Sequence, residues 1–290
     1  MRVDAHHHVW RRTTRGDGAR ATVLDRDFTI EDLRPQASLC GIERTVLVQT
    51  VGDIQETRDL LALADREALI AGVVGWVDLA GPDVAADLDR LRAGPGGSKL
   101  VGIRHQIPRE PRDGLRDSPL VRGLRAVADR GLLFDLLITP AQLSSAIAIT
   151  SVLPELRFAV DHMAKPDVAG KGFESWRPGF TELARRDNVA VKLSGLLTQL
   201  DQDNQGPEAL ASYVSVAVGS FGPERIMYGS DWPLCEPAGG YRRTVDTTAD
   251  LIANLSTAQR DRIMGGTACE WYGFAGGDVS RSTANRTRAA

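Results

Sequence analysis

Residues 44–69 read R-T-V-L-V-Q-T-V-G-D-I-Q-E-T-R-D-L-L-A-L-A-D-R-E-A-L and contain two patterns in succession. The first seven residues form a short run of mostly apolar and β-branched side chains, which is typical of a buried strand. From residue 55 onward, leucines and alanines recur at spacings of three and four, which is typical of an amphipathic helix. A largely apolar strand followed by such a helix indicates a parallel sheet that helices cover.

The same strand-and-helix unit recurs along the chain. Short apolar runs bounded by turn residues lie at residues 3–8, 44–50, 70–79, 100–106, 132–138, 157–163, 189–195 and 225–232. Amphipathic stretches such as residues 119–130 follow these runs. The eight units predict an α/β protein with a single (β/α)8 barrel, the TIM-barrel fold, over residues 1–275.

The end of the chain differs from the rest. Residues 276–290 contain almost no large apolar side chain, so this tail cannot bury apolar surface and is expected to be disordered. No low-complexity linker or change in composition divides the preceding residues. The sequence therefore predicts one domain followed by a short tail.

Composition limits the classes of partner. A formal net charge of −3 argues against binding to nucleic acid, which requires a basic surface. No apolar run approaches the roughly 18 residues of a membrane span, and no secretory leader is visible. Three scattered cysteines, Cys40, Cys235 and Cys269, form neither a disulfide framework nor a zinc motif. We expect a cytoplasmic protein with a small-molecule partner, and the sequence does not indicate the oligomeric state.

Polar residues gather where the predicted strands end, which is where active sites lie in this fold. All five histidines lie at three strand ends: His6, His7 and His8 at the first, His105 at the fourth and His162 at the sixth. Asp231 follows the eighth strand. Because side chains alternate along a strand, His6 and His8 should share one face and His7 should point to the other.

An aspartate and several imidazoles in one cavity are suited to a mononuclear metal site or to metal-free acid–base catalysis. Asp231 is the candidate general base, while His6, His8 and His162 would polarise a carbonyl oxygen or bind the metal together with Asp231. Two alternatives remain at this point: Asp231 could cap the following helix, and His162 could orient Asp161.

Other side chains at the strand ends are candidates for substrate binding. They are Arg104, His105, Lys165, Trp76 and Gln49. The tryptophan would supply an apolar wall for a sugar ring, although core packing is an equal alternative, as a surface position is for the lysine. The sequence reveals no histidine partner for the thiol of Cys235, so it does not predict a cysteine nucleophile.

Several motifs in order resemble the amidohydrolase superfamily, specifically the amidohydrolase-2 family that includes sugar-acid lactonases of the fuconolactonase type. They are D-A-H-H-H-V-W from Asp4, V-V-G-W-V-D-L from Val73, V-G-I-R-H-Q from Val101, V-D-H-M-A-K-P-D from Val160, V-K-L-S-G-L from Val191 and Y-G-S-D-W-P-L from Tyr228. The resemblance covers residues 1 to about 274 and excludes the tail.

The resemblance implies a lactonase that opens a sugar-derived lactone, such as a fuconolactone or rhamnonolactone, to the aldonic acid. It carries the family's HxH motif onto His6 and His8, its later histidine onto His162 and its eighth-strand aspartate onto Asp231. The fourth strand offers arginine and histidine instead of a bridging lysine or acid, which implies at most one metal. Since relatives in this branch include metal-independent enzymes, either one divalent ion, zinc, or none is expected.

Two other activities fit the same resemblance. Metal-dependent decarboxylases of the superfamily reuse the same histidines and aspartate around one metal. A lactonase acting on carboxylated lactones of aromatic degradation would need cations for its substrate, and Arg104, Arg109, Arg112 and Lys165 could supply them.

Overall fold

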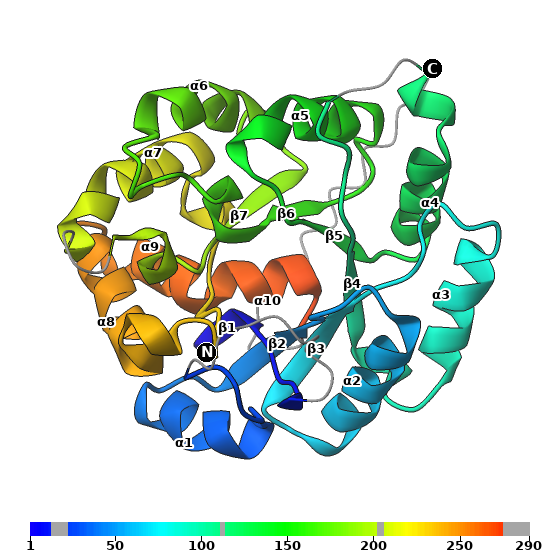
Figure 1. Cartoon of the computed structure of the whole chain (residues 1–290), viewed down its shortest axis with the longest axis horizontal. Helices are drawn as coiled ribbons and strands as arrows, with labels where there is room; N and C mark the ends of the chain where they lie inside the picture. The colour runs from blue at the N-terminus through cyan, green and yellow to red at the C-terminus, as the bar shows by residue number, and fades with distance from the viewer. Residues whose placement is uncertain (13–22, 111–113, 202–205, 275–290) are drawn as a thin grey trace, which may run out of the picture.

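The computed structural model describes residues 1–12, 23–110, 114–201 and 206–274. Eight parallel strands form one sheet in the order of the chain, and this confirms the predicted (β/α)8 barrel (Figure 1). The strands are β1 Val3–His7, β2 Arg44–Val48, β3 Ile70–Gly75, β4 Leu100–Arg104, β5 Leu133–Leu136, β6 Phe158–Val160, β7 Val189–Leu193 and β8 Ile226–Tyr228. The expected disorder of residues 276–290 concerns a segment outside the described residues.

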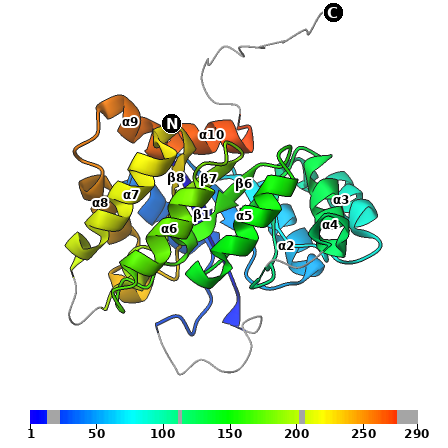
Figure 2. The same ribbon diagram turned by 90° about the horizontal axis from the view of Figure 1, so that it is seen from above.

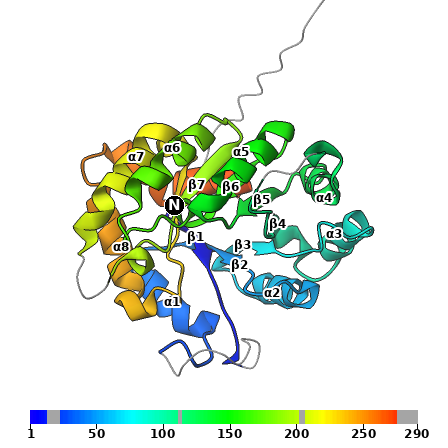
Figure 3. The ribbon, with the colours of Figure 1, turned by 45° about the horizontal axis from the view of Figure 1, so that its top comes forward.

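Helices alternate with the strands and surround them (Figure 3). The helices are α1 Ile30–Leu39, α2 Ile54–Arg66, α3 Val84–Ala93, α4 Pro119–Ala128, α5 Leu143–Val152, α6 Phe173–Leu183, α7 Ala211–Phe221, α8 Gly240–Leu251, α9 Thr257–Asp261 and α10 Thr267–Tyr272. Among the described residues, no helix has the length and apolar character needed to cross a membrane.

Side-chain periodicity explains how a helix is held against the barrel. In α2, Leu60, Leu61 and Ala64 are buried at spacings of one, three and four residues, whereas Arg58 and Asp59 on the other face are exposed. The helix begins at Asp53, whose carboxylate accepts a hydrogen bond from the backbone of Gln55. The apolar stripe is therefore buried between helix and strands.

Contacts beyond the end of β8 close the barrel. The backbone amide of His8 donates to the carbonyl of Trp232 at 2.7 Å, and the amide of Asp231 donates to the carbonyl of His6 at 2.8 Å. These two hydrogen bonds join the carboxyl end of β1 to the segment after β8. They also bring Asp231 beside the histidines of the first strand.

The inside of the barrel is apolar at the starts of the strands and polar at their ends. Val3, Leu133 and Ala190 pack at the starts together with Trp271 and Tyr272 of α10. Figure 2 shows α9 and α10 together on one side of the strands. Helix α10 therefore closes the end of the barrel opposite the histidines, and the polar residues gather at the other end.

Candidate active site

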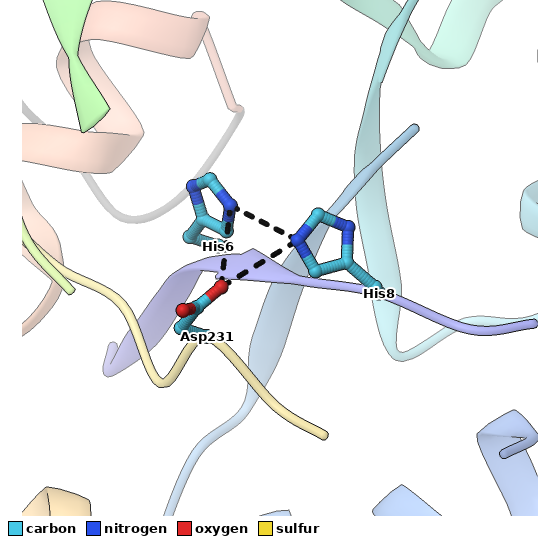
Figure 4. Close-up of side chains that lie close together, drawn as sticks. All are labelled: His6, His8 and Asp231. Atoms are coloured by element: carbon cyan, nitrogen blue, oxygen red, sulfur yellow. Dashed lines mark hydrogen bonds and ion pairs between the residues drawn. The ribbon is translucent and has the colours of Figure 1, made fainter. Parts of the chain in front are cut away.

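Three imidazoles and one carboxylate converge at the carboxyl end of the barrel. The Nε2 atoms of His6 and His8 lie 3.3 Å apart, and they lie 3.7 and 3.5 Å from Oδ1 of Asp231. Figure 4 shows these three side chains directed toward one another. The Nε2 atom of His162 lies 3.9 Å from the same oxygen. All four side chains are buried.

Strand β1 departs from regular alternation between Ala5 and His6. The register of its pairing with β2 shifts between Asp4 and His7. Ala5 packs in the apolar interior of the barrel, and the next residue, His6, also reaches the interior. Such an irregularity re-aims a side chain, and here it directs His6 toward the centre of the barrel.

Each imidazole has a partner for its Nδ1 atom on the side away from the cluster. His8 Nδ1 donates to the carbonyl of Val48 at 2.7 Å, and His162 Nδ1 lies 2.9 Å from the hydroxyl of Ser194. His6 Nδ1 lies 3.2 Å from Oδ1 of Asp161. Such partners orient the rings and leave Nε2 free to face the cavity.

Burial lowers the pKa of His6 and His162, which keeps both imidazoles neutral at neutral pH. Burial alone would raise the pKa of Asp231, but His162 and His8, together with His6, lower it below the ordinary value for aspartate. The cluster therefore places the neutral imidazoles of His6 and His162 beside an ionised carboxylate.

Two of the site residues have unusual backbone conformations. His162 and Asp231 have φ angles of 54° and 57°, in the left-handed region that non-glycine residues rarely occupy. His162 begins a left-handed turn that continues through Lys165. Both residues follow the ends of their strands, so these turns direct the two side chains back over the barrel.

The cluster fits a single cation. Bonds of about 2.0–2.2 Å in a tetrahedral zinc site separate the ligand atoms by roughly 3.3–3.6 Å, close to the separations between His6, His8 and Asp231. Among the described residues, the buried Oδ1 atom of Asp231 has no hydrogen-bond partner, so it is free to act as a ligand. The residues His6, His8, His162 and Asp231 could hold one divalent ion.

A second group that could bind a metal, His6, Asp161 and His162, shares two of these residues. Cations already occupy its carboxylate: Lys192 Nζ lies 3.1 Å from Oδ1 of Asp161, and Arg104 donates to Oδ2 at 3.1 Å. These two charges disfavour another cation at Asp161. The geometry agrees with the expectation of at most one metal.

Sequence reasoning did not single out the charged layer beneath the histidines. Lys192 and Asp135 are completely buried inside β7 and β5, where they form an ion pair, and Asp161 completes the group. A lone charge within an otherwise apolar strand, as in V-A-V-K-L or L-F-D-L, was the available signal. Isolated charges in a buried strand require partners, and here they find one another.

Two of the substrate-binding candidates meet beside the cluster. Arg104 is 5% exposed and lines a cavity of about 150 Å³ together with His8, Trp10, Thr50, Val51 and Leu234. Its guanidinium donates to the carbonyl of Gln49, whose side-chain oxygen is buried without a hydrogen-bond partner among the described residues. Arg104 therefore faces the cavity, whereas Gln49 lies behind it and holds the guanidinium in place.

The other candidates lie farther out. Trp76 and His105 are half-buried and stacked on each other, with ring centroids 5.5 Å apart and an interplanar angle of 17°. Lys165 is half-buried at the end of the left-handed turn that begins at His162. None of the three contributes an atom to the cluster of imidazoles and Asp231.

Two further residues considered from the sequence, Cys235 and Arg109, are not in the cluster. Cys235 is buried, and burial raises the pKa of its thiol, which makes it a poor nucleophile. Arg109 is exposed, and Arg112 lies outside the described residues. Of the two described arginines that the sequence offered for carboxylate binding, Arg104 contacts the cluster and Arg109 does not.

A (β/α)8 barrel with three histidines and an aspartate at the carboxyl ends of its strands defines a class of barrel enzymes with one histidine–aspartate centre. Comparison with known families identifies the family to which the chain belongs. The amidohydrolase family profile matches residues 3–274, and the chain belongs to this family.

Individual relatives cover nearly the whole chain. The L-fucono-1,5-lactonase of Burkholderia ambifaria is 36% identical over 284 residues, which cover 94% of this chain and 95% of the relative. The L-fucono-1,5-lactonase of Burkholderia multivorans is 34% identical over 292 residues, covering 94% and 96%. A crystal structure of an amidohydrolase from Burkholderia multivorans with bound zinc superimposes with a TM-score of 0.84 at 32% identity, covering 94% of this chain and 99% of that chain.

Proposed function

We propose that the protein is a lactonase that hydrolyses a sugar-derived lactone, of the fuconolactone or rhamnonolactone type, to the aldonic acid. The observation that carries this proposal is the convergence of three imidazole Nε2 atoms on Oδ1 of Asp231 within 3.9 Å. Relatives named L-fucono-1,5-lactonase at 36% and 34% identity support the substrate class.

Hydrolysis of a lactone requires a nucleophilic water, a polarised carbonyl and a proton for the leaving oxygen. Asp231 is ionised and accepts the proton of the water as its oxygen bonds to the carbonyl carbon. The ring C–O bond then breaks, and the same proton is returned to the leaving oxygen. The imidazoles of His6 and His162 can present Nε2–H donors to the carbonyl oxygen on which negative charge develops. His8 presents a lone pair there instead, because its proton lies on Nδ1, which donates to the carbonyl of Val48.

A zinc ion bound by His6, His8, His162 and Asp231 would polarise the carbonyl and lower the pKa of a water molecule. Each imidazole supports this use, because its Nδ1 atom faces a partner outside the cluster and its Nε2 atom faces inward.

The cavity beside the cluster supports a small, polar substrate. Its volume of about 150 Å³ is below the roughly 300–1,000 Å³ typical of sites for drug-sized ligands, and it suits a single sugar ring. Arg104 supplies N–H donors for ring hydroxyls, and Trp10 supplies an apolar surface in the same cavity.

A pH-indicator assay tests the proposal on sugar lactones and on carboxylated lactones, before and after removal of metal by a chelator. We expect acid release from sugar lactones, and its loss on chelation would demonstrate a metal requirement. If acid is released from carboxylated lactones alone, the substrate is a carboxylated lactone and not a sugar lactone. Carbon dioxide release from an aromatic acid, without lactone opening, would replace the proposed reaction by decarboxylation.

A further inference from the structure

Lys192 is a buried cation that the proposed mechanism does not use. Its side chain extends from β7 into the barrel and is completely buried. Burial alone would lower its pKa, but the carboxylates of Asp135 and Asp161 raise it above the ordinary value for lysine. Lys192 is therefore an ammonium group with N–H donors directed at its neighbours.

The ammonium of Lys192 is adjacent to the Nδ1 side of His6. Its Nζ atom is paired with Asp135, lies 3.1 Å from Oδ1 of Asp161 and lies 3.3 Å from Nδ1 of His6. Oδ1 of Asp161 is itself 3.2 Å from the same nitrogen. The Nδ1 atom of His6 thus faces both a cationic donor and an anionic acceptor.

The Nε2 side of His6 has the same double character. Arg104 Nη1 lies 3.4 Å from Nε2 and can donate to it. The Nε2 atom of His8 lies 3.3 Å away and can accept a hydrogen bond, and the negatively charged Oδ1 of Asp231 lies 3.7 Å away. His8 differs, because its Nδ1 atom faces only the carbonyl of Val48, which keeps the proton on that nitrogen.

Two hydrogen-bond arrangements therefore satisfy His6. In the first, Nδ1–H donates to Asp161 and the Nε2 lone pair faces the cavity, where either an N–H of Arg104 or a bound cation can occupy it. In the second, Lys192 donates to Nδ1, and Nε2–H points toward His8 and Asp231. Arg104 and Lys192 keep their carboxylate partners in both arrangements.

We propose that Lys192 is a positioning residue that, together with Asp161, allows His6 to exchange its proton between the two ring nitrogens. The lone-pair form suits binding of a cation, and the Nε2–H form suits donation to a carbonyl oxygen. The inference deepens the proposed function, since it assigns His6 its role at the same cavity, but its test does not use a lactone.

The two forms should be populated under different conditions. In the lone-pair form, the unprotonated Nε2 atoms of His6 and His8 face each other at 3.3 Å and repel unless a cation lies between them. We expect the Nε2–H form in chelated protein and the Nδ1–H form after zinc is added. Lys192→Met removes the donor at Nδ1 and should leave the Nδ1–H form under both conditions.

The test is ¹⁵N NMR of histidine-labelled protein at one pH, with the His6 signals assigned by His6→Asn. Signals of an Nδ1–H form in chelated wild-type protein would overturn the proposal, as would an Nε2–H form in chelated Lys192→Met. If Lys192→Met fails to fold, the double variant Lys192→Met with Asp135→Asn removes one buried charge of each sign. If neither variant folds, the comparison of chelated with zinc-loaded wild-type protein can still overturn the proposal.

Zinc affinity, measured by competition with a chromophoric chelator, provides a second readout. The Nδ1–H form of His6 is the one that binds zinc. If this form makes up about a tenth of wild-type protein without metal, Lys192→Met should bind zinc roughly tenfold more tightly. Lys192→Gln loses the same charge but keeps an N–H donor, so it should gain less affinity. Equal gains in both variants would contradict the proposal, and Lys171→Met, at an exposed lysine, should change nothing.

Discussion

At the scale of single residues, the three adjacent histidines of the first strand have different surroundings. His6 and His8 face the cavity, whereas the Nε2 atom of His7 lies 2.9 Å from the hydroxyl of Thr45 on β2. Burial lowers the pKa of His7 to about 3, so it is a neutral group within the wall of the barrel. Adjacent positions in one motif therefore separate into site residues and a structural residue.

Substitution of His7 should separate folding from function. His7→Asn removes a buried hydrogen bond and should lower the free energy of unfolding by about 1–3 kcal/mol, while zinc content and turnover stay near wild type. His6→Asn and His8→Asn should lower both zinc content and turnover. The measurements are urea unfolding, elemental analysis and lactone turnover. Loss of metal or activity in His7→Asn equal to that in its neighbours would contradict the assignment.

Asp231→Asn tests the general base. The substitution keeps the shape of the side chain but removes its proton acceptor, so kcat should fall by about 10²- to 10⁴-fold while the protein remains folded. KM should change far less, and circular dichroism checks the fold. Asp117→Asn, at an exposed aspartate, is the matched control. Nearly full activity in Asp231→Asn would exclude it as the base.

At the scale of elements, the loops after the strands position the catalytic candidates. Gly195 follows β7 with a φ angle of +62°, and a Cβ atom there would lie 2.9 Å from Nδ1 of His162 and 3.0 Å from Oδ2 of Asp231. Glycine is required here because the backbone is left-handed and because a side chain would press against His162 and Asp231. The loop after β7 thus supports side chains from the loops after β6 and β8.

Gly195→Ala should displace His162 and Asp231 without unfolding the protein. A misplacement on the order of 1 Å costs about 10²-fold in rate, and we expect a loss of kcat of that size. Gly131→Ala is a matched control, because Gly131 has a φ angle of +66° but no atom within 4 Å of an added Cβ. Equal turnover in the two variants would show that backbone strain, rather than contact with the site, causes any effect.

At the scale of the whole molecule, Asp4 connects β1 to the segment after β8 and to α8. Its Oδ1 atom accepts hydrogen bonds from the backbones of His6 and Ser230, and Oδ2 accepts from the hydroxyl of Tyr241 in α8. Burial raises its pKa from 3.8 to about 6, although these hydrogen bonds oppose the shift. The closure of the barrel therefore depends on a buried carboxyl group that is ionised at neutral pH.

This shift predicts a pH dependence of stability. The folded state binds the proton of Asp4 more tightly than the unfolded chain, so its contribution is present below about pH 4 and is lost as pH rises through about 6. Asp4→Asn stays neutral and should gain up to about 3 kcal/mol relative to wild type between these pH values. Urea unfolding of both proteins from pH 4 to 7 measures the difference.

The exposed carboxylate of Asp246 provides a control, since Asp246→Asn should show no comparable change. A difference between wild type and Asp4→Asn that is constant across this pH range would contradict the assignment of the pH dependence to Asp4.

The sequence determined the barrel because each strand can be recognised from its own residues. Eight short apolar runs, each followed by an amphipathic stretch, leave few ways to bury both faces of a sheet, and all eight strands are present. It also indicated His6, His8, His162 and Asp231 as site candidates, since parallel strands end at the same rim of the barrel. Alternation along β1 further separated His7 from its neighbours.

Only the tertiary structure decided which charges meet. Lys192, Asp135 and Asp161 are far apart in the chain, and a buried charge does not specify its partner until strands are placed side by side. The inward direction of His6 depends on an irregularity in the pairing of β1, and the directions of His162 and Asp231 depend on left-handed backbone conformations. These features arise from close packing at the mouth of the barrel, which hydrophobic periodicity does not encode.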